Sequence, residues 1–349
     1  RYADVSGLAV GHLGGSQEMK RLCVIPGDGI GHEVVPSAVR VLERLMPSLQ
    51  VTEAEAGWEC FQRHGCSVPD TTLKLMREYG AGLFGAVSSP AHRVEGYRSA
   101  ILTLRQDLKL SVSLRPVRSW PGLSTRMDVN LLILRENSEG LYVGHEHMAS
   151  ADMAIAERHI SRQASEHVAQ RAAEVARLRD SQRITLVHKA NVLPLTCGLF
   201  RDSCRNVLAA EGLAGLVDER LVDVAALQLI ERPQDFDLLV TTNLFGDILS
   251  DLACYWSGGL GLAPSLNWGR GIAIAEPVHG SAPDIAGSGK ANPLAAILSA
   301  ALLLRYHWHA GLLADQLERA VELLLTELSV AELGDQTTDI IERELLKRL

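Results

Sequence analysis

The 349-residue sequence lacks several features that would restrict its class at once. No apolar run reaches the roughly 18 to 20 residues that a membrane-spanning helix needs, and no segment resembles a secretory signal. No block of basic residues occurs and the net charge is −8. This balance argues against nucleic acid or an anionic membrane surface as the main partner.

Paired cysteines are also missing, since the six cysteines are scattered and include no Cys-x-x-Cys pair. Several lie among apolar residues, as Cys23 does, and buried, reduced thiols of a cytoplasmic protein are the simplest account. Two His-x-His pairs occur, His145/His147 and His307/His309. Because no cysteine and no third histidine lies near either pair at ligand spacing, we expect surface or loop histidines rather than metal ligands.

Length and composition predict two domains of ordinary size, because 349 residues exceed what a single core usually serves. Hydrophobic residues at 47% and charged residues at 22% are sufficient for a large core. Residues 1–18 are rich in Gly and Ser, so we expect a leader or a disordered segment before a natural start at Met19. No repeat and no low-complexity linker marks the boundary between the domains.

Strands and helices alternate along the remainder of the chain. An apolar strand at 22–25 leads through a glycine-rich turn into an amphipathic helix that ends near 45, which is the opening of an α/β layer. The sequence predicts further strands near 50–55, 81–85, 111–116, 129–135, 183–188 and 236–240. It predicts helices near 70–79, 97–107, 152–178, 292–305, 310–327 and 336–348, one after Pro194 and one over the segment from Asn243 to Asp251.

The glycine-rich turn has the spacing G-x-G-x-G over residues 27–31, not the G-x-G-x-x-G of a Rossmann dinucleotide site. No acidic residue is convincingly placed after the next strand to hold a ribose, and Glu53 and Glu55 are weak candidates. We therefore predict a tight turn that brings backbone close to a ligand. The dinucleotide site is expected elsewhere in the chain.

Asp247 and Asp251 carry the first signal of chemistry, because residues four apart share one face of a helix. Two such carboxylates repel each other, and a hard divalent cation with oxygen ligands relieves the repulsion. Solvated acidic residues near a helix N-terminus are the alternative for this pair alone. A third carboxylate, Asp223, lies upstream, and a polar turn runs from Glu276 to Asp284. The set predicts a metal beside a nucleotide-sized turn.

Six stretches of sequence together carry a family resemblance. They are 26–33, 104–105 with 114–116, 135–142, 188–191, 242–251, and 276–284 with 292–293. From about Arg21 to its end the chain resembles the β-hydroxyacid oxidative decarboxylases, which include isocitrate, 3-isopropylmalate and homoisocitrate dehydrogenases. The resemblance implies a two-domain, isopropylmalate-dehydrogenase-like α/β fold that is not a Rossmann fold. One domain would combine 19–112 with 259–349, the second would span 113–258, and the active site would lie between them.

The resemblance also implies roles for individual residues. Asp247 and Asp251 would bind Mg²⁺ or Mn²⁺ together with Asp223 of the partner subunit, so a homodimer is the smallest active unit and a higher homo-oligomer is possible. The metal would act as a Lewis acid on the substrate. Lys189 would be the base that takes the hydroxyl proton, and Tyr142 would protonate the enolate carbon.

Substrate carboxylates would be held by guanidinium forks, which match a carboxylate with two parallel hydrogen bonds. The implied substrate contacts, besides Tyr142 and Lys189, are Ser89, Arg98, Ser99, Arg105, Arg115, Arg135 and Asn191. The implied cofactor contacts are Asn191, Glu276, His279, Gly280, Ser281, Ala282, Asp284 and Asn292. The carboxylate of Asp284 can accept both ribose hydroxyls of NAD and would repel the 2′-phosphate of NADP, so the predicted cofactor is NAD.

The segment before Arg105 indicates the substrate, since isopropylmalate enzymes are apolar there. Arg98 and Ser99 supply a cation and a hydroxyl, which suits a distal carboxylate. We predict oxidative decarboxylation of homoisocitrate to 2-oxoadipate and CO₂, in lysine synthesis through aminoadipate, with isocitrate as a second substrate. Leu102 stands where some bacterial homoisocitrate enzymes carry arginine, and isocitrate or 3-isopropylmalate dehydrogenase is the alternative. A non-catalytic regulatory subunit is the alternative of another class, although this chain keeps the implied base, acid and metal ligands.

Overall fold

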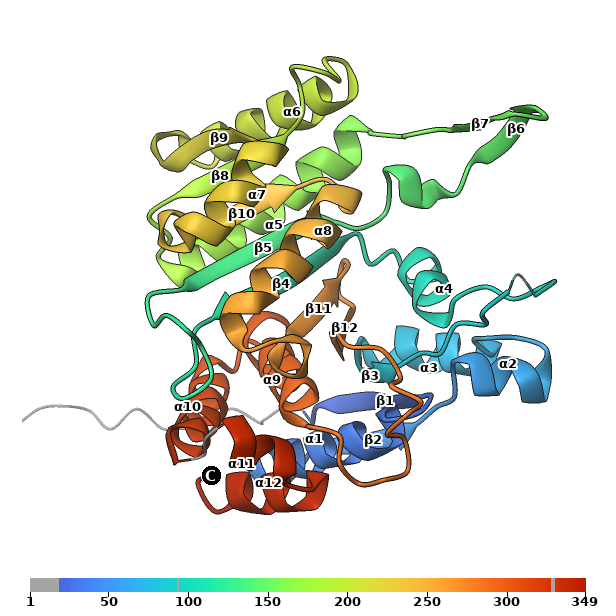
Figure 1. Cartoon of the computed structure of the whole chain (residues 1–349), viewed down its shortest axis with the longest axis vertical. Helices are drawn as coiled ribbons and strands as arrows, with labels where there is room; N and C mark the ends of the chain where they lie inside the picture. The colour runs from blue at the N-terminus through green and yellow to red at the C-terminus, as the bar shows by residue number, and fades with distance from the viewer. Residues whose placement is uncertain (1–18, 93, 328–329) are drawn as a thin grey trace, which may run out of the picture.

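A computed structural model describes residues 19–92, 94–327 and 330–349, so the predicted leader at 1–18 lies outside the described residues (Figure 1). A ten-stranded sheet has the order β2-β1-β3-β12-β11-β4-β5-β10-β8-β9. Its two ends are parallel, whereas β12, β11, β4 and β5 pair antiparallel in the middle. The predicted mixed α/β architecture is confirmed.

Segments from both ends of the chain build one half of the molecule. The strands are β1 (Arg21–Gly27), β2 (Gln50–Glu53), β3 (Ala81–Ala86), β11 (Pro264–Trp268) and β12 (Ala273–Pro277). The helices are α1 (Gly31–Leu45), α2 (Trp58–His64), α3 (Asp70–Tyr79), α4 (Ala100–Asp107), α9 (Leu294–Leu302), α10 (Gly311–Glu327), α11 (Val330–Asp335) and α12 (Thr338–Leu346). A π-helical turn at Leu303–His307 follows α9 directly.

The middle of the chain builds the other half. Its strands in the large sheet are β4 (Val112–Arg118), β5 (Asn130–Glu136), β8 (Ile184–His188), β9 (Val217–Leu221) and β10 (Leu238–Thr241). Its helices are α5 (Arg162–Arg179), α6 (Thr196–Ala210), α7 (Val222–Glu231) and α8 (Asn243–Ala253). Two further strands, β6 (Glu146–Ser150) and β7 (Met153–Ala156), pair antiparallel in an arm that extends away from the body (Figure 1).

Successive residues of a strand point to opposite faces of the sheet, and here each face has its own core. On β5, Leu132 and Leu134 join the core that contains α5 and α6, whereas Leu131 and Ile133 join the core that contains α7 and α8. Because both faces are covered by helices, these strands read as continuous apolar runs. The aspartate-bearing helix α8 is therefore held against the sheet by its apolar side.

The helix predicted over 152–178 was wrong at its start. Residues 153–156 form β7, which pairs with β6, and the helix begins at Arg162. The hydroxyl of Ser161 accepts a hydrogen bond from the Ala164 N–H at 3.1 Å and caps the helix. The Ala-rich composition of the segment favours helix, but pairing across the arm takes precedence. The sequence did not predict α2, α7, β9, β11 or β12, whose short segments carry little periodic signal.

The glycine-rich turn after β1 is confirmed as tight, but the close approach that we expected to a ligand is made to protein backbone. A Cβ added at Gly27 would lie 2.0 Å from the Ala86 carbonyl oxygen, and one at Gly29 would lie 2.3 Å from that of Ser281. The fully buried carboxylate of Asp28 accepts backbone N–H bonds from Trp58, Glu59 and Ser88, each at 2.8 Å. The turn therefore holds together the segments around Trp58, Ser88 and Ser281, and the last of these lies in the predicted cofactor segment.

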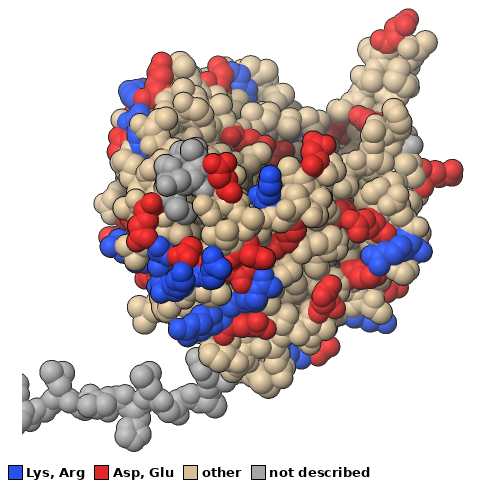
Figure 2. All heavy atoms as spheres, turned by 60° about the horizontal axis from the view of Figure 1, so that its bottom comes forward, with Lys and Arg blue, Asp and Glu red and all other residues tan. Residues whose placement is uncertain are grey.

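The cysteines and the charged surface side chains are distributed as the composition suggests. All six cysteines are free and five of them are buried. Acidic and basic side chains are mixed over the face in Figure 2, without a continuous basic field on that face. In the part of the chain that the structure describes, no helix is long and apolar enough to cross a membrane.

Candidate active site

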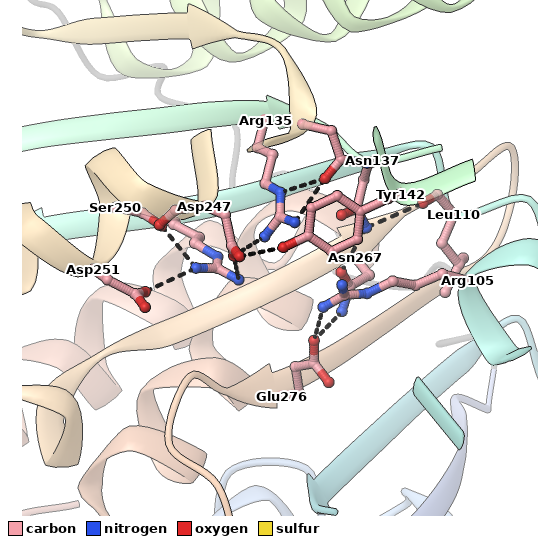
Figure 3. A network of polar contacts seen from close by, with 12 residues as sticks. Arg105, Leu110, Arg135, Asn137, Tyr142, Asp247, Ser250, Asp251, Asn267 and Glu276 are labelled. Carbon is pink, nitrogen blue, oxygen red and sulfur yellow. Dashed lines mark hydrogen bonds and ion pairs between the residues drawn. The ribbon is translucent and has the colours of Figure 1, made fainter. Parts of the chain in front are cut away.

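Asp247 lies at the centre of a polar network that joins the helix α8 to the sheet (Figure 3). Its Oδ1 accepts a hydrogen bond from Arg135, and its Oδ2 accepts one from the Tyr142 hydroxyl at 2.5 Å. Arg135 is almost completely buried, and its Nε and Nη2 both donate to the Asn243 Oδ1, at 2.9 and 2.6 Å. The network thus assembles the predicted acid, one predicted metal ligand and one predicted substrate arginine.

Arg115, on β4, spans the two carboxylates of α8. Its guanidinium lies 3.4 Å from Asp247 Oδ1 and 3.2 Å from Asp251 Oδ1, and it donates to the Ser250 hydroxyl at 2.7 Å. The two carboxylates therefore face the same cation from successive turns of one helix, as their spacing predicted. Asp251 is the more accessible, with 57% of its side chain exposed against 32% for Asp247.

Arg105, on α4, lies near Arg135 and contacts the predicted cofactor segment. Its Nη2 donates to Glu276 Oε1 at 2.6 Å, and the same oxygen accepts from Asn267 Nδ2 at 2.7 Å. Asn137 Nδ2 in turn donates to Asn267 Oδ1 at 3.0 Å. The Nε of Arg105 is buried and has no partner among the described residues. A predicted substrate residue and a predicted cofactor residue are therefore direct neighbours.

Burial and the concentrated charges shift the pKa values of the ionisable groups in the network. Burial and the neighbouring Arg115 and Arg105 lower the pKa of Arg135 to about 10. Burial acts to raise the pKa of Asp247, but the cationic Arg135, the Tyr142 hydrogen bond and Arg115 outweigh it and lower that pKa below its ordinary value.

The pKa values of two further groups of the network are raised. Burial raises the pKa of Asp251, with Asp247 adding to the rise and Arg115 opposing it. Burial and the hydrogen bond to Asp247 raise the pKa of Tyr142, so its hydroxyl keeps its proton at neutral pH.

Lys189 and Asp223 lie outside this network and contact each other. Lys189 Nζ donates to Asp223 Oδ1 at 2.5 Å, and 62% of the Asp223 side chain is exposed. Asn191 is exposed and makes no side-chain hydrogen bond with the described residues. Within one chain the predicted base and third metal ligand therefore form a separate, accessible pair.

The predicted substrate segment before α4 is organised by an aromatic cluster. The Tyr97 ring meets Trp58 and Phe61 edge to face, at 5.0 and 5.2 Å between centroids. Its hydroxyl donates to the Ser88 carbonyl oxygen at 3.0 Å and also contacts Ser89.

The two predicted polar contacts of this segment are engaged locally. Arg98 donates to Gln106, and the Ser99 carbonyl oxygen accepts from Thr103 in the first turn of α4. Both residues precede the helix that carries Arg105, and neither forms a hydrogen bond with the network among the described residues.

The predicted cofactor turn is anchored to the glycine-rich turn. The Ser281 carbonyl oxygen accepts from the Ile30 N–H at 2.9 Å, and the Ser281 hydroxyl meets that of Ser88 at 2.8 Å. Ala282 has a left-handed φ of 40°, while Asn292 Oδ1 accepts from the Leu294 N–H at 3.0 Å at the start of α9. Backbone and side-chain hydrogen bonds therefore hold the turn in place.

Three features of this turn fit a ligand. The Nε2 of His279 is buried without a partner among the described residues. A Cβ added at Gly280 would meet no atom within 4 Å, so the space beside it is open. Asp284 is exposed and makes no ion pair with the described residues, which leaves its carboxylate available to hydroxyl groups. These groups fit the ribose and adenine of a nicotinamide dinucleotide.

The donor set on α8 also fits a hard divalent cation. Both side chains offer carboxylate oxygens, which Mg²⁺ and Mn²⁺ prefer. The raised pKa of Asp251 has the charge of Asp247 among its causes, and a cation between them would remove that repulsion. Each chain supplies two carboxylates here, and the third predicted ligand, Asp223, is accessible from outside.

Sequence reasoning missed three supporting groups of the network. Asn243 and Ser250 hold the two guanidinium groups, and Asn267 holds the Glu276 carboxylate. The first two lie four residues before and three after Asp247, positions that share its helix face, so helical spacing alone could have identified them. Asn267 is on β11, a strand that the sequence did not predict, and no local signal marks it.

Known proteins share this sequence and fold. The model of the isocitrate/isopropylmalate dehydrogenase family matches residues 21–347. The "Isocitrate/homoisocitrate dehydrogenase" of Thermus thermophilus is 50% identical over 320 residues, which are 92% of this chain and 93% of that protein. The "3-isopropylmalate dehydrogenase" of Archaeoglobus fulgidus is 42% identical over 323 residues, 92% of this chain and 94% of that protein.

A solved structure agrees with these similarities. The crystal structure of isocitrate dehydrogenase from Methylococcus capsulatus superposes with a TM-score of 0.88 at 39% identity, and the match covers 95% of this chain and 99% of that one. The predicted fold class is thereby confirmed, and a Rossmann fold is not indicated. The chain belongs to the isocitrate/isopropylmalate dehydrogenase family of oxidative decarboxylases.

Proposed function

We propose that this protein is an NAD- and divalent-metal-dependent homoisocitrate dehydrogenase that produces 2-oxoadipate and CO₂ and also accepts isocitrate. The network of Arg105, Arg115 and Arg135 with Asp247 and Asp251 carries the proposal. Its three guanidinium groups face three carboxylates when Glu276 is included. A divalent cation would leave the site positive, which favours a substrate that carries several carboxylates.

The relatives support a third carboxylate on the substrate without deciding it. The 50% identical relative carries both isocitrate and homoisocitrate in its name, and a 40% identical relative from Methanocaldococcus jannaschii is named "Homoisocitrate dehydrogenase". Arg98 could reach a distal carboxylate by leaving Gln106, to which it now donates. Isocitrate or 3-isopropylmalate is the alternative substrate, since isopropylmalate dehydrogenases lie at 42–44% identity.

We assign the steps to side chains as follows. Arg105, Arg115 and Arg135 bind and orient the substrate carboxylates by paired hydrogen bonds. Lys189 takes the hydroxyl proton as the alcohol is oxidised, and a bound nicotinamide would accept the hydride. Tyr142 then delivers its proton to the carbon that loses CO₂. The metal supplies Lewis-acid stabilisation of the negative charge in both steps.

A shared active site is part of the proposal. Lys189 and Asp223 form an accessible pair, and the nearby helices α7 and α8 expose the apolar side chains Val224, Leu227, Ile230 and Ile248. An exposed apolar face of this kind favours contact with a second copy. In a homodimer the Lys189–Asp223 pair of one subunit would complete the Asp247–Asp251 site of its partner, and larger homo-oligomers would keep this unit.

The remaining assignments complete the proposal. One domain comprises 19–112 with 259–349 and the other 113–258, so that closure of the cleft between them excludes water. The proposal includes a cytoplasmic location and a role in lysine synthesis through aminoadipate. The reduced cysteines agree with that compartment.

A steady-state assay tests the proposal. NADH formation is followed at fixed Mg²⁺ with homoisocitrate, isocitrate and 3-isopropylmalate, each repeated with NADP and with EDTA. We expect the highest kcat/KM with homoisocitrate and NAD, and no turnover in EDTA. A preference for isopropylmalate would contradict the polar reading of the site. Absence of turnover with all three would favour the non-catalytic alternative.

A further inference from the structure

Three metal-ligating side chains meet at the base of the β6–β7 arm, away from the Asp247 network. Glu157 Oε2 lies 2.8 Å from His159 Nε2 and 3.7 Å from His145 Nδ1. The two imidazole rings are in edge contact, with centroids 5.0 Å apart and planes at 79°. One ligand atom from each residue lies within 4.8 Å of the others. Folding therefore brings His159 beside His145, whereas His147, the other member of the pair noted in the sequence, lies outside the cluster.

Backbone hydrogen bonds fix the three positions. The Glu157 N–H donates to the His145 carbonyl oxygen at 2.9 Å across the arm. His159 and Gly140 exchange both of their backbone bonds, at 2.8 and 3.3 Å. The arm base is thus a short antiparallel ladder that holds the ligands independently of the tip. A preformed arrangement lowers the conformational cost of binding an ion.

We propose that His145, Glu157 and His159 form a Zn²⁺ site, with water as the fourth ligand. Zn–N and Zn–O bonds of about 2.0 to 2.2 Å place neighbouring ligands of a tetrahedron roughly 3.3 Å apart. The Glu157–His159 and Glu157–His145 separations of 2.8 and 3.7 Å lie on either side of that value, and the two histidine ligand atoms lie within 4.8 Å of each other, so small side-chain movements would bring the three ligands to bonding positions. Two imidazoles favour Zn²⁺ over Mg²⁺, which requires oxygen ligands.

An ordinary ion pair explains the cluster less completely. One carboxylate can neutralise one imidazolium, yet two histidines converge on the same Glu157 oxygen. A second candidate cluster, Glu55, Cys60 and His64, differs because Arg63 already occupies the Glu55 carboxylate at 2.9 Å. Burial also raises the pKa of the Cys60 thiol to about 11, which disfavours a thiolate ligand.

The site would join the two sides of the arm at its root. Beyond it, the arm exposes the apolar side chains Met148, Met153 and Ile155, which are 62%, 54% and 41% exposed. All residues of β6 and β7 are exposed, so little of the arm is buried against the rest of the described chain. A bound ion would therefore limit the motion of an arm that presents an apolar surface.

Isothermal titration with Zn²⁺ tests the site on the full-length, untagged protein after EDTA treatment and in excess Mg²⁺, which occupies the carboxylate site. An Asp251→Asn background removes residual Zn²⁺ binding there. We expect one Zn²⁺ per chain, with at least about tenfold weaker binding in His159→Ala and Glu157→Gln. His147→Ala is the matched control, because His147 lies on β6 two residues after His145 and outside the cluster, and it should bind as the parent does.

Co²⁺ gives a second readout that does not depend on enzymatic activity. A tetrahedral site with two imidazoles produces intense visible absorption on Co²⁺, and Zn²⁺ should displace it. Equal affinity in the parent and in His159→Ala, or loss of binding in His147→Ala to the same degree, would overturn the assignment. Absence of a Zn²⁺ isotherm in the parent would also refute it. None of these results depends on which substrate the enzyme takes.

Discussion

Substitution of the two carboxylates of α8 separates a structural role from a ligand role. Asp247 accepts from Arg135, whose side chain is 1% exposed, whereas Asp251 is 57% exposed and forms an ion pair with Arg115 alone among the described residues. Removing one partner of a buried ion pair costs about 3 to 5 kcal/mol, while exposed pairs contribute about 0 to 1 kcal/mol. We expect Asp247→Asn to destabilise the metal-free protein by about 3 kcal/mol, and Asp251→Asn by less than about 1 kcal/mol.

Both substitutions should abolish the response to metal. A ligand at 100 times its dissociation constant stabilises the folded state by about 2.7 kcal/mol. Saturating Mg²⁺ should therefore raise the thermal midpoint of the parent protein and leave both variants unchanged. Without metal, only Asp247→Asn should melt several degrees lower, since about 1 kcal/mol corresponds to roughly 2 °C or more in a protein of this size.

Differential scanning fluorimetry at one fixed scan rate, with EDTA and with Mg²⁺, measures the metal-free melting midpoints and the Mg²⁺-induced shifts of the parent and of both variants. Ser250→Ala is the structural control, because it removes a partner of Arg115 and no carboxylate. Equal destabilisation by Asp247→Asn and Asp251→Asn without metal would refute the role given to the buried Arg135. A Mg²⁺ shift that persists in both variants would refute the metal site.

The pH dependence of the same melting curves follows from the two pKa shifts. The pKa of Asp247 is lowered by folding. Its contribution to the stability of the folded state is therefore complete above the ordinary carboxylate pKa and is lost as the pH falls through the lower, folded value. The pKa of Asp251 is raised, so its ionisation disfavours the metal-free folded state as the pH rises through the carboxylate range. Stabilisation by Mg²⁺ should therefore increase from acidic to neutral pH. A stabilisation that decreases over this range would contradict the assignment.

Three further substitutions test the assigned roles. Lys189→Ala should lower kcat by about 10² to 10⁴ while leaving the apo melting point within about 1 °C, because its partner Asp223 is exposed; full activity would overturn the mechanism. Tyr142→Phe should lower kcat by about 10² or more with little change in KM, measured by the same NADH assay, and an unchanged kcat would remove Tyr142 from the chemistry. Asp284→Lys should raise kcat/KM for NADP relative to NAD by about tenfold or more, since it replaces a repulsive carboxylate by a cation; an unchanged ratio would place the ribose elsewhere.

The sequence by itself determined the family, the α/β class and most of the residues of the network. Asp247 and Asp251 share a face because helical periodicity fixes that relation locally. Their motif context, together with Arg115 and Arg135, then identified the family before any fold was known. Similarly, strands such as β5 were predicted because burial on both faces leaves a continuous apolar run.

Only the tertiary structure decided how distant residues meet. Arg105 and Glu276 are 171 residues apart in the chain and form a buried pair because the pairing of β12 with β3 and of β11 with β4 brings their segments together. Strand pairing likewise converted part of a predicted helix into the β6–β7 arm and carried His159 to His145. Such contacts depend on pairing between strands, which leaves no periodic signal at the residues themselves.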